Sequence, residues 1–217
     1  MSALKPSFPP STSPSPPKEE SLSLKSLIKA LNLIPHIEGG YYAETDRAKE
    51  NIPSPFASKI SSTTTGLVPG RPGFDPSLRS LSTTIFYLLT PSGPQGGFHR
   101  NASRTVHTLH RGRGRYVIIH ADEEGKEKRV ESFVVGHDVE KGEKLQWIVD
   151  GGKFKASYLL PDEEGGSESR GLLISETVVP GFEFVDHDFL APEGLVDLLG
   201  EKKAGELSWL LSPLGKK

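Results

Sequence analysis

Short runs in which apolar and polar residues alternate fill the chain from about residue 81 onward. The runs are rich in β-branched and aromatic residues, and turn-forming clusters such as Pro91-Ser92-Gly93-Pro94 and Gly151-Gly152 separate them. This pattern is typical of half-buried strands joined by tight turns. Because no helical pattern lies between the runs, they predict an antiparallel sandwich or barrel. The expected strands are 83–89, 105–110, 116–121, 130–135, 145–149, 156–160, 172–179 and 182–189.

The N-terminal part of the chain has a different character. Residues 1–20 are mostly Ser and Pro and cannot bury enough apolar surface to offset their ordering entropy, so they predict a disordered tail. An organellar transit peptide is the alternative, although the segment holds no Arg and no amphipathic helix. Apolar residues of 22–33 then recur at helical spacing; Ser21 or Ser23 can cap this helix and Pro35 ends it.

Helical spacing returns at the C-terminus. Pro192 suits the first turn of a helix, Gly200 can stop it, and a second short helix is expected at 204–211. Residues 47–78 show little periodicity and hold much Pro, Ser, Thr and Gly. We interpret them as a long excursion around an early strand at 60–66.

The amino-acid composition of the chain excludes several classes of function. Lys and Arg number 26 against 28 Asp and Glu, so the net charge of −2 favours neither nucleic acid nor an anionic membrane as partner. The chain has no Cys, which excludes disulfides and thiolate metal sites. No run of about 18 apolar residues and no apolar signal segment occur, so we expect no membrane span and a cytoplasmic or nuclear location. The expected divisions are a tail at 1–20, a β domain at 21–191 and a helical extension at 192–217.

Basic residues and histidines gather in one stretch without acids. Residues 76–121 contain no Asp or Glu, and four of the seven histidines lie there. One interpretation is a solvated basic face answered by acidic turns; the other is a site for an anion, because Arg offers a planar fork that matches carboxylate or phosphate. The basic residues of the stretch are Arg79, Arg100, Arg104, Arg111, Arg113, Arg115, His99, His107, His110 and His120.

Spacing limits which histidines can act together. His107 and His110 are three apart, so on one strand they face opposite sides. His99 follows Gly96-Gly97, which we interpret as a turn at a barrel mouth. A metal would therefore use His99 with one of the other two, and a carboxylate from a distant strand. Glu176 is the candidate, since it interrupts an apolar strand; it faces either the interior or the solvent.

Three further places hold candidate ligand-binding residues. Gln146 and Trp147 are neighbours on one strand, so one of them faces the core and the other does not. Lys155 comes just after a glycine turn, near a barrel mouth. The segment 38–45 combines two Gly with paired Tyr, and Tyr42 and Thr45 in it are either packing residues or contacts to a ligand.

Several segments, in order, resemble the motifs of the DUF985 cupins, also called the cupin-5 family. The segments are 31–45, 82–89, 97–100 and 179–184, and the resemblance covers about residues 22–190. It implies an all-β fold, the cupin double-stranded β-helix or jelly-roll barrel, here with an N-terminal helix and short C-terminal helices, and usually a homodimer. The shape is also similar to that of sugar-nucleotide epimerases, an analogy of fold alone.

The chain departs from the pattern of many bacterial members, which is Phe-His-Arg followed by Asp-Glu-x-Trp-His. Here Arg104 and Thr105 replace the acidic pair, Thr108 replaces the second His, and His99 is retained. The broader cupin pattern H-x-H…E…H is absent as well. We therefore expect a fungal-type member with no bound metal, in which His99 is the residue that could hold one.

Three hypotheses of function follow. The first is a metal-independent epimerase, isomerase or lyase that acts on a small anionic metabolite, either phosphorylated or resembling a nucleotide sugar. His99 would be its acid or base, with Glu176 or Tyr87 as the partner, and Arg100 or Arg104 would bind the negative charge of the substrate. The second is a non-catalytic protein that binds such a molecule in the same pocket. The third is a metal-dependent dioxygenase of the broader cupin kind. The remaining expected ligand contacts are Tyr42, Thr45, His107, Gln146 and Lys155.

Overall fold

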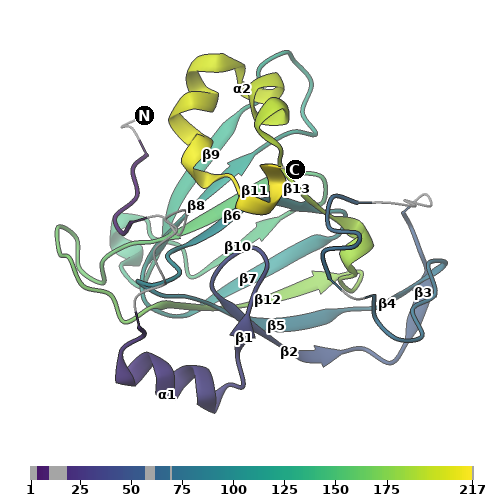
Figure 1. Ribbon diagram of the computed structural model, residues 1–217, viewed down its shortest axis with the longest axis horizontal. Helices are drawn as coiled ribbons and strands as arrows, with labels where there is room; N and C mark the ends of the chain where they lie inside the picture. Colours follow the sequence, from purple (N-terminus) through teal and green to yellow (C-terminus); the bar gives the residue numbers. More distant parts are fainter. Residues whose placement is uncertain (1–3, 10–18, 57–61, 69, 217) are drawn as a thin grey trace.

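Two antiparallel sheets face each other in the computed structural model, which describes residues 4–9, 19–56, 62–68 and 70–216 (Figure 1). The six-stranded sheet has the order β1-β2-β5-β12-β7-β10 and the five-stranded sheet the order β13-β6-β11-β8-β9. The bounds of the first sheet are β1 Ile34–Pro35, β2 Tyr41–Arg47, β5 Thr83–Leu89, β12 Leu172–Val179, β7 Arg104–Arg111 and β10 Gln146–Val149. Those of the second are β13 His187–Phe189, β6 Gln95–Asn101, β11 Phe154–Leu159, β8 Gly114–Ile119 and β9 Val130–Val135. A separate pair is formed by β3 Asn51–Pro53 and β4 Leu78–Ser80.

Helices cover the outer faces of the two sheets (Figure 1). The helix α1, Leu22–Ala30, begins at Ser21, whose hydroxyl accepts from the Leu24 amide, and Leu24 packs with Leu88 and Leu173 on the first sheet. The helix α2 spans Pro192–Leu207 and packs against Phe98, Val117 and Ile119 of the second sheet. Each fully buried aliphatic side chain in these layers stabilises the fold by about 1.5–3 kcal/mol. The 3-10 turns are η1 Val139–Lys141, η2 Phe184–Asp186, η3 Ser208–Leu210 and η4 Pro213–Lys216.

The space between the sheets is filled in two ways. Aromatic and aliphatic side chains, among them Tyr116, Trp147 and Ile174, form a core in one part. Polar side chains occupy another part, and His107, Lys155 and Glu176 are all less than 9% exposed there. An interior in which ionisable groups are buried among aromatic rings is the feature that positions the candidate site.

The expected all-β fold with terminal helices is confirmed, and several strands have the predicted bounds. Gly200 interrupts α2 with a φ of 74°, as its expected role at a helix end requires. Of the run 182–189, only His187–Phe189 is a strand, because η2 occupies Phe184–Asp186. Residues 57–61 of the segment expected to hold an early strand lie outside the described part, and Thr65 beyond them forms an isolated bridge to Val68.

The prediction of a turn at Gly96-Gly97 is wrong, because both glycines lie inside β6. A Cβ at Gly96 would come within 2.6 Å of the Tyr87 hydroxyl, and one at Gly97 within 2.7 Å of the Ser212 backbone. The two glycines therefore allow close approach between elements and do not turn the chain.

The N-terminal tail is described in part. Residues 10–18 lie outside the described residues, as do 1–3. Leu4 packs against the core cluster beneath α2, and Phe8 against the cluster between the sheets.

Candidate functional site

A buried ion pair joins the two sheets across the interior. Lys155 of β11 places its Nζ 2.8 Å from Oε2 of Glu176 on β12 and 2.9 Å from Nε2 of His107 on β7. His107 and Glu176 are register partners on neighbouring strands, and their Nε2 and Oε2 atoms are 3.4 Å apart. The ammonium group thus bridges an imidazole and a carboxylate that face it from the opposite sheet.

The charges of this first cluster support one another. Burial raises the pKa of Glu176, but the attraction of Lys155 and His107 outweighs it and holds that pKa well below its ordinary value. Burial and then the neighbouring Lys155 ammonium lower the pKa of His107. Glu176 is consequently a carboxylate and His107 a neutral ring that accepts a hydrogen bond from Lys155.

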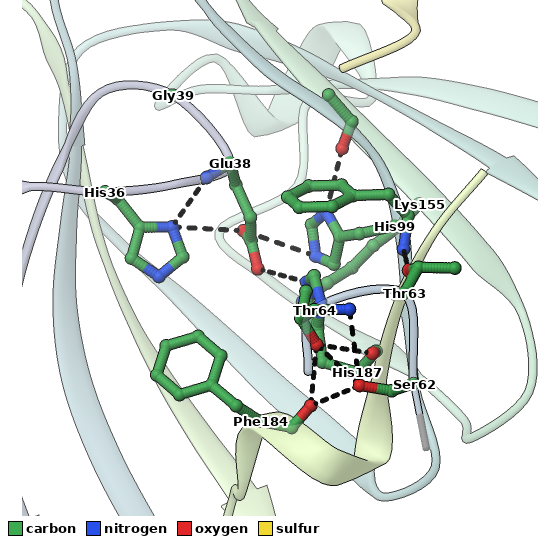
Figure 2. Close-up of polar contacts among 12 residues, drawn as sticks. His36, Glu38, Gly39, Ser62, Thr63, Thr64, His99, Lys155, Phe184 and His187 are labelled. Carbon is green, nitrogen blue, oxygen red and sulfur yellow. Dashed lines mark hydrogen bonds and ion pairs between the residues drawn. The ribbon is translucent and has the colours of Figure 1, made fainter. Parts of the chain in front are cut away.

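A second polar cluster surrounds the carboxylate of Glu38 (Figure 2). Its Oε1 is 2.9 Å from Nε2 of His187, and its Oε2 is 3.4 Å from Nε2 of His99. On the other side of the carboxylate, Nδ1 of His36 lies 3.6 Å from Oε2. The rings of His99 and His187 stack at 5.1 Å, so two imidazoles from adjacent strands approach one carboxylate together.

Local chain geometry explains why these groups meet. Glu38 precedes Gly39 and Gly40, whose φ values are 110° and 67°, and a Cβ at Gly39 would lie 2.1 Å from the Gln95 carbonyl oxygen. Only glycine permits this turn, which brings Glu38 against the second sheet. The Thr64 hydroxyl contacts the carbonyls of Phe184 and His187 and anchors the strand that carries His187.

Burial governs the ionisation of this second cluster. It lowers the pKa of His99 to about 3, and the positive charge of Lys155 contributes in the same direction although Glu38 opposes it. The pKa of Glu38 is raised by burial, but the three surrounding histidines outweigh that effect and bring it below its ordinary value. Glu38 is therefore a carboxylate beside a neutral His99.

A cavity of about 240 Å³ opens onto both clusters. Glu38 and His36 of the second cluster and Glu176 of the first lie on its wall, together with Tyr42. Its lining also includes Arg47, Arg71, Phe182 and Phe184. Arg47 and Arg71 both pair with Glu183, at 2.9 Å and 2.8 Å.

Tyr87 lies behind the cavity wall. Its hydroxyl donates to the Gly39 carbonyl at 2.9 Å, and the residue is 2% exposed. Burial, and then the charges of Glu38 and Glu176, raise its pKa well above the ordinary value. Tyr87 is consequently a neutral hydrogen-bond donor that supports the Glu38 turn.

Six of the residues expected at the site are brought to the interior or to its cavity. His99, Glu176, Tyr87, His107 and Lys155 are buried, and Tyr42 lines the cavity. The interior orientation of Glu176 and His107, which the sequence left open, is now settled, and His110 is exposed on the opposite face of β7. Of these six, Glu176 and Tyr42 line the cavity, whereas His99, Tyr87, His107 and Lys155 do not.

The structure places the other four expected residues elsewhere. Arg104 is exposed and pairs with Asp150 at 2.9 Å, because its neighbour Thr105 takes the inward position on β7. Gln146 is exposed because Trp147 takes the core side of β10. Thr45 is exposed and donates to the Thr84 carbonyl, and Arg100 pairs with Asp188 at 3.1 Å.

Sequence reasoning missed Glu38, His36 and His187. Glu38 and His36 lie in the segment that carried the family resemblance, next to the paired glycines that could have indicated them. His187 had no comparable signal, because it contacts Glu38 across 149 positions of sequence.

Two antiparallel sheets that form a jelly-roll barrel are the architecture of the cupin class of β proteins. The profile described as "Cupin superfamily (DUF985)" matches residues 25–190, and the chain belongs to this family. It is 46% identical over 196 residues to the uncharacterised protein YML079W of Saccharomyces cerevisiae, covering 90% of this chain and 89% of the yeast protein.

Two solved structures share the fold. A hypothetical protein from Leishmania major has a TM-score of 0.63 and 29% identity, covering 79% of this chain and 89% of that one. Protein SO0799 from Shewanella oneidensis has a TM-score of 0.63 and 24% identity, covering 87% and 97%. Among the described residues, none of the helices has the length and apolar character needed to cross a bilayer.

Proposed function

We propose that the barrel cavity binds a small anionic metabolite and that its wall carries out proton transfer of the isomerase or epimerase type. The observation that carries this proposal is the position of Glu176, a buried carboxylate on the cavity wall that lies 2.8 Å from the Lys155 ammonium. A carboxylate base beside a fixed cation suits the removal of a proton next to a carbonyl group.

The roles follow from the charges. Glu176 takes the proton from the carbon atom, and the electron pair of the broken C–H bond moves onto the carbonyl oxygen. Lys155 does not line the cavity but lies 2.8 Å from Glu176, and its buried positive charge stabilises the negative charge that develops on the oxygen. Where the carbon that loses the proton also carries a hydroxyl group, the hydroxyl proton passes to the former carbonyl oxygen, the hydroxyl oxygen becomes the new carbonyl, and Glu176 returns its proton to the former carbonyl carbon, which completes an isomerisation. Epimerisation needs a second proton donor, and His99 and Tyr87, the residues expected for that role, do not line the cavity, so isomerisation by Glu176 alone is the favoured reaction.

An anionic ligand is favoured by the guanidinium groups at the cavity. Arg47 and Arg71 share the Glu183 carboxylate, and a carboxylate or phosphate of the ligand can take the place of Glu183 on either one. The cavity volume of about 240 Å³ suits a small metabolite or one part of a larger one.

Non-catalytic binding is the second candidate function, and the Lys155 contact favours it. An ion pair that keeps the pKa of Glu176 well below its ordinary value also makes this carboxylate a weak base. A protein that uses Lys155 to hold an anion, with Glu176 to position the lysine, has the same contacts without turnover.

One experiment separates the two functions. The protein is screened by thermal shift against sugar phosphates, nucleotide sugars and small hydroxy and keto acids, and each stabilising compound is incubated with it in D₂O. Proton-transfer function predicts deuterium in the compound by NMR, lost in Glu176→Gln and retained in the exposed control Arg104→Ala. Binding without exchange in the wild-type protein would assign the non-catalytic function, and no stabilising compound would contradict both.

We also propose the homodimer that the family resemblance implies. Sedimentation velocity tests it: a single species at twice the mass of the 23.6 kDa chain is expected, and a monomer at micromolar concentration would refute it.

A further inference from the structure

The carboxylate of Glu38 and the imidazoles of His99 and His187 have the composition of a metal-binding site. We infer that these three residues bind a divalent transition-metal ion. Their ligand atoms, one from each residue, all lie within 4.8 Å of one another. The inference stands on this ligand set and is independent of whether the cavity turns over a substrate.

The separations between ligand atoms suit such an ion. Glu38 Oε2 is 3.4 Å from His99 Nε2, and Glu38 Oε1 is 2.9 Å from His187 Nε2. Zinc–nitrogen and zinc–oxygen bonds of about 2.0–2.2 Å place two tetrahedral ligands about 3.4 Å apart. Small side-chain rotations would bring all three atoms onto one ion.

The hydrogen bonds of His99 identify which of its nitrogens is free to bind. Nδ1 lies 2.8 Å from the Gly97 carbonyl oxygen, which can only accept, so Nδ1 carries the proton. In the neutral ring Nε2 then presents a lone pair, and it is directed at the Glu38 carboxylate. A carbonyl bond to the far nitrogen is also how proteins orient metal-binding histidines.

His36 adds a second acceptor beside the same carboxylate. Its Nδ1 accepts from the Glu38 amide at 3.3 Å and lies 3.6 Å from Glu38 Oε2. Oε2 therefore faces the lone pairs of two imidazole nitrogens. Three acceptor atoms in one buried place need a positive charge among them, which either a proton or a bound cation can supply.

In the first cluster, the positive charge among the buried acceptor atoms comes from Lys155. His107 Nε2 and Glu176 Oε2 are also 3.4 Å apart, and the Lys155 ammonium lies 2.9 Å and 2.8 Å from them. In the described part of the chain, the ion-pair partners of Glu38 within 4.0 Å are histidines and include neither Lys nor Arg. A bound cation would have the role at Glu38 that Lys155 has at Glu176.

The surroundings favour a metal site with restricted access. The rings of Phe182, Phe184 and Phe189 are T-shaped to the His187 ring, with centroids 6.0, 6.4 and 4.9 Å from its centroid. Glu38 itself lies on the cavity wall, so an ion with three protein ligands can hold a water or a ligand atom there. Nδ1 of His187 has no hydrogen-bond partner among the described residues, so it can carry the ring proton while Nε2 binds the ion.

The ligand types select the class of ion. Two imidazoles and one carboxylate suit Zn²⁺ and Fe²⁺ and the neighbouring first-row ions, whereas Mg²⁺ and Ca²⁺ prefer oxygen ligands alone. The added positive charge would also make the cavity more receptive to an anion.

Metal titration of the full chain tests the inference. Protein freed of metal with a chelator is titrated with Co²⁺ by visible absorption and with Zn²⁺ by calorimetry, and one equivalent of each is expected to bind. Glu38→Gln and His187→Asn should each weaken binding by at least about 100-fold, since loss of supporting contacts alone costs 10–100-fold. His110→Gln, on the exposed face of β7, should leave the affinity unchanged.

Failure of the metal-free wild-type protein to bind one equivalent of either ion would overturn the inference, as would unchanged affinity in both ligand variants. Circular dichroism establishes that each variant is folded. If either variant is unfolded, X-ray absorption of the Zn²⁺-loaded wild-type protein tests the metal site in its place. Two imidazole nitrogens in the first shell support the site, and a shell of oxygen atoms alone contradicts it.

Discussion

The ammonium group of Lys155 lies 2.8 Å from the carboxylate of Glu176, and this contact connects the two sheets of the barrel through its interior. Lys155 is 3% exposed and Glu176 is 7% exposed, so neither charge is compensated by bulk water. The pair, with His107, organises one half of the polar interior, and each member depends on the others for its charge state.

Removal of one member should therefore be costly. Lys155→Met leaves the Glu176 carboxylate buried without its cation and is expected to lower the free energy of unfolding by about 3–5 kcal/mol. The double variant Lys155→Met, Glu176→Leu removes both charges and should recover much of that loss. Urea denaturation measures both quantities. A single variant within about 1 kcal/mol of the wild-type protein would show that water reaches the pair.

Stability should fall on mild acidification because His107 is buried as a neutral ring. Its pKa in the folded protein lies below the ordinary 6.5. Below pH 6.5 the unfolded chain takes up a proton at this position and the folded chain does not. The free energy of unfolding therefore decreases as the pH falls, by up to about 1.4 kcal/mol per pH unit from this residue.

Urea midpoints between pH 8 and pH 5, measured with a chelator present, test this pH dependence. His107→Gln is expected to have a shallower slope than the wild-type protein, and His110→Gln, on the exposed face of the same strand, the same slope. Equal slopes for the wild-type protein and His107→Gln would assign the acid sensitivity to other groups.

The glycines of β6 should not tolerate a side chain. Gly96→Ala would place a methyl group 2.6 Å from the Tyr87 hydroxyl, which supports the Glu38 turn. We expect a loss of about 1–3 kcal/mol in thermal or urea unfolding, as for other overpacked positions. Gly205→Ala is the matched control, since no atom lies within 4 Å of its Cβ position in α2 and alanine favours a helix. If both variants were equally stable, the close approach of Tyr87 would not be the reason why residue 96 is a glycine.

A second buried ion pair holds the excursion between β2 and β5 to the barrel. Arg79 of β4 binds Asp186 through Nε at 2.6 Å and Nη2 at 2.9 Å, and both residues are at most 4% exposed. Arg79→Met should lower the free energy of unfolding by about 3–5 kcal/mol. Arg104→Met, which breaks the exposed pair with Asp150, should change it by less than about 1 kcal/mol. Comparable losses in the two variants would contradict this dependence on burial.

The fold was predicted well where apolar and polar residues alternate along a strand and turn-forming residues flank it. The strands at 83–89, 130–135 and 172–179 have the expected bounds, since each runs between clear turn signals. β6 was missed because paired glycines are typical of turns, whereas here they allow tertiary contact. β2 was missed because its sequence, Tyr-Tyr-Ala-Glu-Thr-Asp-Arg, has little apolar alternation.

The candidate site was harder to predict, because its contacts join distant parts of the chain. Strand parity correctly separated His107 from His110, and that rule needs only local spacing. The acid-free stretch suggested either a solvated basic face or an anion site, yet Arg79 pairs with Asp186 in the interior and Arg104 with Asp150 outside. Pairing of this kind depends on the completed fold, and no pattern within 76–121 contains it.

Glu38 and His187 lie far apart in the sequence, and this separation affects how the protein folds during its synthesis. Glu38 lies ahead of β2, near the beginning of the barrel, and His187 lies in β13, the last strand. A nascent chain on the ribosome cannot assemble the Glu38 cluster until the last strand has left the exit tunnel, because folding during translation proceeds from the N-terminus. Until then Glu38 and His99 lack their third partner, so this part of the interior is completed only after β13 has been synthesised.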